Sequence, residues 1–303
     1  MLRGFKKVTA ETRIIYDRYM EKMPGTLHSD MYFPEMYAYD EMFTTYYCEM
    51  CGYLVIYVHD EVFKEKYCFM PLGQYEEQSF KELITELEVL FKERGLRFMF
   101  SDIPEWALVY FDRLKEYNLN IWYQNARSDY IYKMEDFRNK VESSPNRYKY
   151  RRFIRNNQPR YEIIQTENKQ QCVEVNQNYW CGLHDCSYCA DGCEKAALER
   201  LIDMYEDMQT EGILVYDGTG KAIAFSIIGR INHQLLMIIS KKKKLFGIAE
   251  YIHHVLLELY GEGVETVNNG IDLGLEGQRT FKSRCADRYS LFHNYNIILE
   301  KRR

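Results

Sequence analysis

The sequence predicts an α/β protein with mixed sheets, divided into two domains. Its 303 residues exceed what one ordinary hydrophobic core accommodates, so two domains of roughly 150 residues are expected. Short apolar segments with strand character alternate with amphipathic helical segments in both halves. The composition is 46% hydrophobic and 28% charged, which excludes a disordered chain. No apolar run approaches the ~20 residues of a membrane helix, which argues against a membrane-spanning protein.

The first half of the chain alternates helical and extended segments. A helix is expected to begin at Ser79, as its cap, and to end at Gly95, because glycine readily adopts the left-handed conformation that closes a helix. Pro104 is expected to begin the next helix. The predicted helices cover residues 11–23, 79–94 and 104–117, and the predicted strands cover residues 53–59, 66–72, 96–100 and 120–123.

The second half repeats this order with clearer signals. The Asp217–Gly220 segment (Asp-Gly-Thr-Gly) predicts a tight turn between two strands, and a third strand follows it. The helix expected over 248–260 has its apolar residues on one face. The predicted strands cover residues 130–133, 213–216, 222–231, 235–239, 264–267 and 295–299, and a further helix covers 194–208. The pattern places the boundary near residue 128, which gives domains of 1–128 and 129–303.

Charge and cysteine content restrict the partners and the compartment. The net charge of −5 gives no general attraction to nucleic acid or to anionic lipid, so such a partner would need a local patch. The nine cysteines are an odd number, and no export signal is recognisable at the start of the sequence. Reduced thiols or a metal site are therefore expected rather than a disulfide framework, and the expected location is cytoplasmic.

A candidate phosphate-binding loop, Lys244-Leu245-Phe246-Gly247-Ile248-Ala249, joins a predicted strand to the helix at 248. The first turn of a helix has unpaired amide donors and a partial positive charge, so it can hold an anion by backbone alone. Gly247 would let the anion approach, and Lys241–Lys244 would supply four positive charges at the mouth. The alternative is a solvated lysine turn before a helix-starting glycine. The candidate donor-binding residues are Ser240, Lys244, Gly247, Ile248 and Ala249.

This loop resembles the signature of GNAT acyltransferases, which reads Arg or Gln, two residues, Gly, one residue, Gly or Ala. The surrounding order of three antiparallel strands, loop, helix and strand is similar to the core of that fold. The resemblance implies an acyl-CoA donor whose pyrophosphate lies on residues 244–249.

A closing segment at 268–282 carries a more specific resemblance. It is similar to the phosphatidylglycerol lysyltransferase C-terminal domain family, a tandem GNAT fold related to the Fem aminoacyltransferases. Residues 129–132 and the basic positions Arg151 and Arg152, with Asn156, also resemble that family. The resemblance implies two tandem GNAT-like domains and transfer of an acyl or aminoacyl group from acyl-CoA or aminoacyl-tRNA to an amine or hydroxyl. The matching residues of the closing segment are Asn268, Asp272, Gly274, Glu276, Gly277, Arg279 and Lys282.

The closing segment also supplies the candidate catalytic residues. If a short helix begins near Leu275, Glu276 and Arg279 lie one turn apart, and so do Arg279 and Lys282. Acyl transfer to an amine needs a base that takes the proton and donors that hold the developing oxyanion. The catalytic candidates are Asp272, Glu276, Arg279 and Lys282, with Asp272 or Glu276 as the proton acceptor. The alternative is a structural ion-pair network.

Some positions depart from the family pattern. The family's tyrosine and proline after the lysine are replaced here by Cys285 and Asp287, its Glu-Lys pair by Ile239 and Ser240, and an asparagine by Phe153. These departures motivate a competing hypothesis, a non-catalytic binding or sensor protein that keeps the tandem GNAT fold.

Residues 146–160 are strongly basic and contain no acid. Six basic residues are interleaved with Tyr148, Tyr150 and Phe153. Cations with aromatic rings suit phosphates and unpaired bases, so the tRNA of an aminoacyl donor or a lipid head group at a membrane surface is a candidate partner. The alternative is an amphipathic basic helix against an acidic surface of the other domain. The candidate patch is Arg147, Lys149, Arg151, Arg152 and Arg155.

A cluster of soft ligands occupies thirteen residues of the second half: Cys181, His184, Cys186, Cys189 and Cys193. Thiolate and imidazole ligands this close together suggest a structural zinc or iron site. The alternative is a set of reduced thiols in a loop before the helix at 194.

Overall fold

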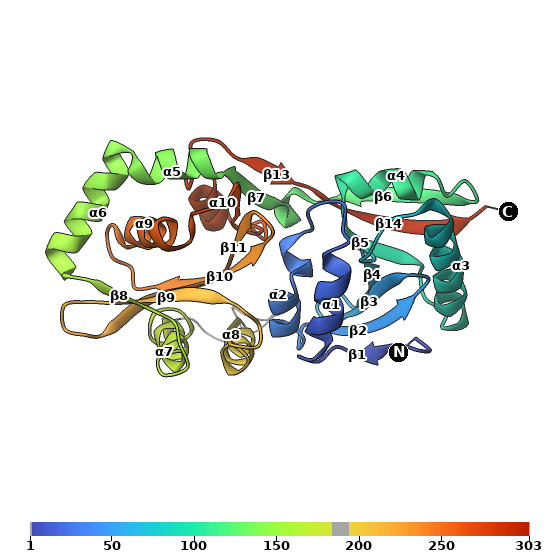
Figure 1. Cartoon of the computed structure of the whole chain (residues 1–303), viewed down its shortest axis with the longest axis horizontal. Helices are drawn as coiled ribbons and strands as arrows, with labels where there is room; N and C mark the ends of the chain where they lie inside the picture. The colour runs from blue at the N-terminus through green and yellow to red at the C-terminus, as the bar shows by residue number, and fades with distance from the viewer. Residues whose placement is uncertain (1, 184–193, 303) are drawn as a thin grey trace. The chain divides into compact units, whose positions relative to one another are not determined.

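A computed structural model describes residues 2–183 and 194–302. The chain forms two compact units, one of residues 1–127 with 292–303 and one of residues 128–291. Each unit is built on one seven-stranded mixed sheet with helices beside it (Figure 1). No helix in the described part of the chain is long and apolar enough to cross a membrane.

The sheet of the first unit has the order β1-β2-β3-β4-β5-β14-β6. Strand β3 is central and almost wholly buried, as expected from its continuous apolar run. Strands β4 and β5 are parallel and are joined by helix α3, whereas β2, β3 and β4 are antiparallel. The strands are β1 (Lys6–Lys7), β2 (Phe43–Met50), β3 (Tyr53–Asp60), β4 (Glu65–Phe69), β5 (Met99–Pro104), β6 (Tyr117–Tyr123) and β14 (Asn294–Lys301).

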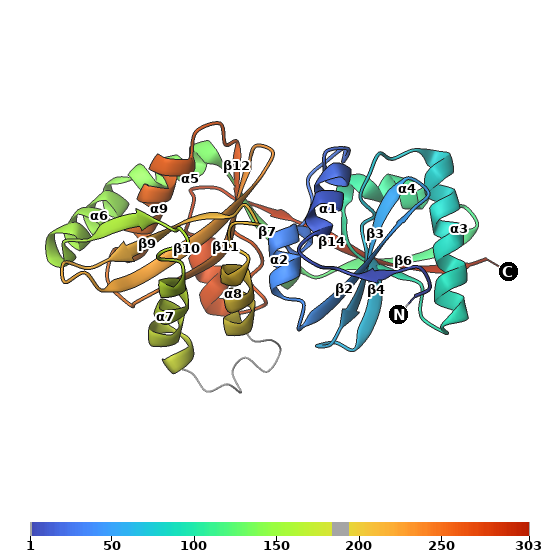
Figure 2. The ribbon, with the colours of Figure 1, turned by 60° about the horizontal axis from the view of Figure 1, so that its bottom comes forward.

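Helices cover both faces of this sheet. Helices α1 (Thr12–Met20) and α2 (Phe33–Ala38) lie on one side, and α3 (Glu77–Glu93) and α4 (Leu108–Asp112) lie on the other (Figure 2). Helix α3 begins two residues before Ser79, whose hydroxyl donates to the Glu76 carbonyl, so Ser79 is not its cap. The predicted stop at Gly95 is confirmed by its φ of 63°.

The sheet of the second unit has the order β13-β7-β12-β11-β10-β9-β8. The predicted antiparallel order of β9, β10 and β11, followed by a helix and another strand, is confirmed, and this last strand, β12, is parallel to β11. Strand β11 is longer than predicted because it continues through Ser240 to Lys242. The strands are β7 (Asp129–Lys133), β8 (Arg160–Ile163), β9 (Glu211–Tyr216), β10 (Ala222–Ile231), β11 (Gln234–Lys242), β12 (Thr266–Asn268) and β13 (Ser290–Phe292).

Helices also cover both faces of the second sheet (Figure 1). Helix α9 lies on one face together with α5 and α6, and α7 and α8 lie on the other. Helix α9 has the predicted bounds, Ile248–Tyr260. The others are α5 (Met134–Glu142), α6 (Ser144–Asn157), α7 (Gln170–Tyr179), α8 (Glu194–Asp203) and α10 (Glu276–Lys282).

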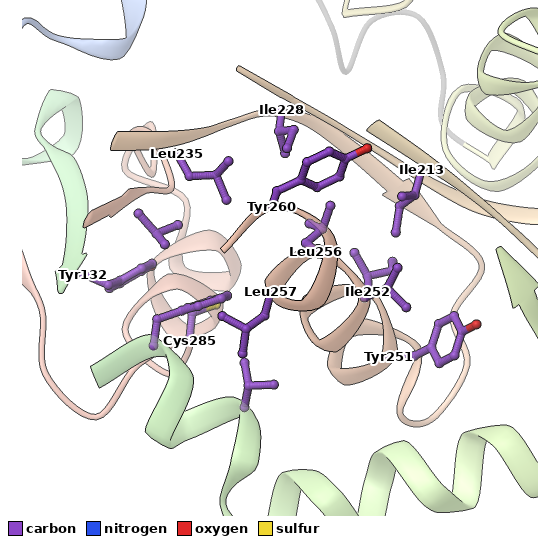
Figure 3. Packing of buried hydrophobic residues seen from close by; sticks show 14 of the residues in the cluster. Tyr132, Ile213, Ile228, Leu235, Tyr251, Ile252, Leu256, Leu257, Tyr260 and Cys285 are labelled. Carbon is purple, nitrogen blue, oxygen red and sulfur yellow. The ribbon is translucent and has the colours of Figure 1, made fainter. Parts of the chain in front are cut away.

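The core of the second unit is built around α9. Ile252, Leu256 and Tyr260 lie toward the strands that carry Ile213, Ile228 and Leu235 (Figure 3). All of these side chains are at least 90% buried. At roughly 1.5–3 kcal/mol for each fully buried large apolar side chain, this cluster fixes α9, and therefore its first turn, against the sheet.

The last strand corrects the predicted domain division. Residues 129–303 were expected to form the second domain, but β14 pairs with β5 and β6 of the first sheet. Strand β7 begins the second unit close to the predicted boundary. The second unit is therefore inserted between β6 and β14 of the first unit. A pattern-based boundary assumes contiguous domains, and it could not find this return of the chain.

Candidate active site

The candidate site of the second unit begins where two neighbouring strands separate. The parallel strands β11 and β12 pair only over Gln234–Leu236 and Thr266–Asn268. Beyond these pairs, β11 continues for six residues without a strand partner on that side among the described residues, while it remains paired with β10 on the other. Helix α9 begins six residues after the end of this segment, so the unpaired part of β11 and the start of α9 are neighbours in the chain.

The first turn of α9 offers backbone donors. The Tyr251 amide donates to the Gly247 carbonyl at 3.0 Å, and the Ile248 amide makes a long bond of 3.4 Å to Leu245. Among the described residues, no acceptor lies within hydrogen-bond reach of the amides of Ala249 and Glu250. The start of α9 can therefore accept an anion.

Helix α6 sets how closely a ligand can approach this turn. A Cβ atom at Gly247 would lie 2.3 Å from the Lys149 carbonyl oxygen, and φ at Gly247 is 85°. Glycine is thus required for the contact with α6, which differs from the predicted role of admitting an anion. Lys149 also forms an ion pair of 2.7 Å with Glu250 in the first turn of α9.

The four lysines Lys241–Lys244, at the end of β11 and just after it, do not act as one group. Lys241 is buried and pairs with Glu194 at 2.6 Å, with its ammonium 4.0 Å from the Trp180 ring centroid. Lys243 and Lys244 are exposed. The expectation of four charges at the mouth is therefore wrong for Lys241, because it is buried and paired with Glu194. The Ser240 hydroxyl donates to the Phe225 carbonyl of β10.

Lys242 is a site residue that the sequence did not single out. It lies on the unpaired part of β11, with its ammonium 5.1 Å from the Phe281 ring centroid. No carboxylate in the described part of the chain lies within 4.0 Å of it. Burial lowers the pKa of Lys242, and burial also lowers the pKa of the nearby His253 to about 4. Within a run of four lysines, the sequence does not distinguish Lys242 from a solvated cation.

The basic stretch forms helix α6 and packs on α9 of its own unit. Phe153 is fully buried and lies 5.3 Å from the Tyr251 ring, which explains an apolar residue where the family has asparagine. This packing buries one face of the helix within its own unit. The basic residues Arg147, Arg151, Arg152 and Arg155 are exposed, whereas Lys149 is committed to Glu250.

Two exposed rings accompany these arginines. Tyr148 is 57% exposed and Phe246 is 54% exposed, and their ring centroids lie 6.4 Å apart. The Arg152 guanidinium lies 5.0 Å from the Phe246 centroid and donates to the Tyr148 hydroxyl. We call Arg147, Arg151, Arg152, Arg155, Tyr148 and Phe246 the α6 face. It combines charges that bind phosphate with rings that can stack on bases.

The predicted short helix in the closing segment is confirmed as α10, which begins at Glu276 after Leu275. Asp272 is 2% exposed and accepts hydrogen bonds from the Tyr130 hydroxyl at 2.9 Å, the Gly274 amide at 2.7 Å and Arg279 Nε at 3.1 Å. Although burial opposes ionisation, these donors lower the pKa of Asp272. A carboxylate held ionised in this way is a weak base that positions Arg279.

The other two catalytic candidates differ in exposure. Glu276 is exposed and pairs with no cation in the described part of the chain. The Lys282 ammonium donates to the Asn269 carbonyl, and the Tyr132 hydroxyl donates to the Lys282 carbonyl. Two tyrosines of β7 therefore hold the closing segment: Tyr130 contacts Asp272, before α10, and Tyr132 contacts Lys282, at the end of α10. The sequence indicated these tyrosines only as strand residues. Burial raises the pKa of Cys285 to about 12, so this thiol is protonated and inert.

Replacing Asp272 by asparagine should destabilise the chain by roughly 1–3 kcal/mol at pH 7, because the buried Tyr130 and Gly274 donors lose an ionised acceptor. The folded pKa lies below the unfolded value of about 3.9, so the wild-type contribution is present above pH 4 and is lost as the pH falls through the folded pKa. Urea unfolding at pH 7 and pH 3 measures this. Glu276→Gln, at an exposed position, should change stability by less than about 0.5 kcal/mol. An undiminished Asp272→Asn effect at low pH would contradict the assignment.

Four of the predicted metal ligands, His184, Cys186, Cys189 and Cys193, lie outside the described residues. Cys181 is described, at the start of the 3₁₀ turn Cys181–Leu183, where its sulfur accepts a hydrogen bond from Asn176.

Comparisons with known proteins agree with this fold. The chain resembles a conserved protein of unknown function from Bacteroides thetaiotaomicron, with 19% identity, a TM-score of 0.87, and coverage of 99% of this chain and 100% of the other. It resembles L-PGS from Bacillus licheniformis at 15% identity and a TM-score of 0.64, covering 94% and 91%. It resembles FemX at 10% identity and a TM-score of 0.64, covering 97% of both chains. A search of curated proteins finds no match.

These likenesses, with the strand orders of both sheets, give the fold as two tandem GNAT-like domains. The family model for the C-terminal region of phosphatidylglycerol lysyltransferase matches residues 27–286 of the 303. The family resemblance of segment 268–282 is confirmed by this match. The chain therefore belongs to the phosphatidylglycerol lysyltransferase C-terminal family.

Proposed function

We propose that this chain is a GNAT-like transferase that moves an aminoacyl group from aminoacyl-tRNA to an amine or hydroxyl acceptor. Family and fold support an acyl or aminoacyl transferase in general terms. The observation that carries the choice of donor is the α6 face, which lies beside the start of α9 and includes Phe246 of the loop that leads into α9.

The two donors make different demands on this region. The end of a tRNA presents phosphates and unpaired bases, which match the four exposed arginines and the two exposed rings of the α6 face. A CoA pyrophosphate needs space beside the first turn of α9. There, the Lys149 carbonyl fills the space next to Gly247, and the Lys149 ammonium is paired with Glu250 and adds no free positive charge for a pyrophosphate. These features favour the tRNA donor.

The proposed step joins the acceptor to the aminoacyl carbonyl carbon. The acceptor nitrogen or oxygen attacks this carbon and the bond from the carbon to the ribose oxygen breaks. The proton that the acceptor loses passes through Glu276 to the ribose oxygen. Glu276 is exposed and free to take the proton of the acceptor, whereas Asp272 is engaged with three donors. Lys242 on the unpaired part of β11 supplies positive charge for the developing oxyanion. Arg279, fixed by Asp272, orients the acceptor.

A transfer assay tests this proposal. Total tRNA charged with radiolabelled amino acids is incubated with the chain and a panel of amines and hydroxyl compounds, including phospholipid vesicles, and acetyl-CoA is tested in parallel. We expect label to move from tRNA to at least one acceptor, and Glu276→Gln to slow transfer about 10²-fold or more. Turnover of acetyl-CoA alone would contradict the tRNA donor. Binding of charged tRNA without transfer to any acceptor would support the non-catalytic sensor.

A further inference from the structure

A second cluster of chemically active side chains lies within the first unit, apart from the transferase site. His28 precedes the 3₁₀ turn Ser29–Met31, Asp30 lies within this turn, and Asp102 lies on β5. His28 Nδ1 is 3.3 Å from Asp102 Oδ1 and 3.6 Å from Asp30 Oδ2, and the three atoms lie within 4.8 Å of one another. Nothing in the transferase proposal uses this cluster.

The two separations from His28 Nδ1 suit a bound divalent cation. Zinc and similar ions sit about 2.0–2.2 Å from imidazole nitrogen and carboxylate oxygen. Two ligands at that distance from one ion are roughly 3.0–3.6 Å apart when the angle at the ion is between tetrahedral and octahedral values. The His28–Asp102 and His28–Asp30 separations fall in this range.

The protonation pattern also favours a cation. The Asp30 amide donates to His28 Nδ1 at 3.4 Å, so this nitrogen is an acceptor, and a bound cation would replace this long hydrogen bond. The nitrogen and the two carboxylates are then three acceptors that face one another. The other oxygen of Asp102 accepts from the Ser101 hydroxyl at 3.0 Å, which holds the carboxylate in place as outer-shell partners of metal ligands do.

The charged groups around these three residues carry more negative than positive charge. Three carboxylates, Asp30, Asp60 and Asp102, act on one guanidinium, that of Arg127. Asp60 and Asp102 are more than 90% buried, and Arg127 is nearest to Asp30, at 3.8 Å. The three carboxylates and the guanidinium together carry a formal charge of −2. A divalent cation would balance this charge.

We propose that His28, Asp30 and Asp102 bind one divalent metal ion of the Mn²⁺ or Zn²⁺ type, which ties the turn at 29–31 to β5. Two carboxylates and one imidazole form a ligand set that accepts Mn²⁺, whereas thiolates prefer softer ions. Asp30, whose side chain is 25% exposed, provides the entry side, and His28 and Asp102 form the buried floor. The site is independent of the transferase proposal.

Mn²⁺ binding to the full chain tests this site, because Mn²⁺ discriminates against the cysteine cluster at 181–193. After treatment with EDTA, titration followed by electron paramagnetic resonance of free Mn²⁺ should show one bound ion per chain. Asp30→Asn should weaken this binding at least tenfold, and Asp112→Asn, exposed on α4, should leave it unchanged. Mn²⁺ should also raise the Tm of the wild type and not that of Asp30→Asn.

The partial exposure of Asp30 makes the Asp30→Asn variant compatible with folding, and circular dichroism checks it. Asp102→Asn serves as the second variant and should also weaken Mn²⁺ binding. The proposal is overturned if the wild type binds no stoichiometric Mn²⁺, which would leave an ion-pair network centred on Arg127. It is equally overturned if Asp30→Asn binds Mn²⁺ with the wild-type affinity.

Discussion

Replacing Gly247 by alanine should destabilise the second unit by roughly 2–4 kcal/mol. A left-handed backbone costs a non-glycine residue about 1–2 kcal/mol, and φ at Gly247 is 85°. The new Cβ would also meet the Lys149 carbonyl at 2.3 Å, and overpacking of this kind costs about 1–3 kcal/mol. Because relief of the clash moves α6 away from the start of α9, binding of charged tRNA should weaken as well. Denaturant unfolding and filter binding measure the two effects.

The chain supplies a matched control for this substitution. Gly220, in the turn between β9 and β10, also has a φ of 85°, but nothing lies within 4 Å of the place that an alanine methyl group would take there. Gly220→Ala should therefore cost only about 1–2 kcal/mol and leave tRNA binding intact. Equal losses of stability in the two variants would show that the Lys149 carbonyl of α6 does not lie against Gly247 as described.

Removing the charge of the α6 face should weaken binding of aminoacyl-tRNA by about 100-fold at low salt. The variant carries glutamine at Arg147, Arg151, Arg152 and Arg155, which are all exposed, so the fold should be retained. Each phosphate contact releases counterions, so the slope of log K against log salt should fall by up to about 3 when four contacts are lost. Binding measured from about 50 to 200 mM salt gives both quantities.

A second fourfold variant makes the same charge change elsewhere. Arg3, Arg94, Arg97 and Arg302 are exposed in the first unit, and replacing them by glutamine lowers the net charge equally. If general attraction governed binding, both variants would lose affinity to the same degree. We expect this control to bind within about threefold of the wild type.

Local patterns in the sequence were sufficient for the antiparallel order of β9, β10 and β11 and for the helix that follows them. The bounds of α9 follow from its apolar face, and the turn at Asp217–Gly220 defines the hairpin of β9 and β10. The place of β14 between β5 and β6 was not predictable in this way. β14 pairs with strands more than 170 residues earlier, β5 and β6, and no local period carries that information.

The candidate site was predictable only where one segment carried it. Residues 268–282 hold Asp272, Glu276 and Arg279 close together in sequence, so the pattern indicated them. The roles of these residues depend on contacts with distant segments. The Tyr130 hydroxyl donates to Asp272 and helps to keep its carboxylate ionised. The Lys149 carbonyl lies where a side chain at position 247 would be, which accounts for glycine there. The pairing of β11 with β12 ends before Lys242, which leaves Lys242 on an unpaired strand segment. Sequence spacing cannot show which donors surround a carboxylate or which backbone fills the space beside a glycine.

Affinity labelling by a reactive donor tests the proposed donor site most directly. A tRNA charged with an amino acid whose amine carries a bromoacetyl group places an alkylating carbon where the aminoacyl group binds, and mass spectrometry locates the modified residue. We expect modification within residues 237–249 or 276–285, at Lys242 or Lys282 among the amines, and protection by excess unmodified aminoacyl-tRNA. Modification confined to the first unit would contradict this donor site. So would labelling that is prevented by acetyl-CoA but not by aminoacyl-tRNA.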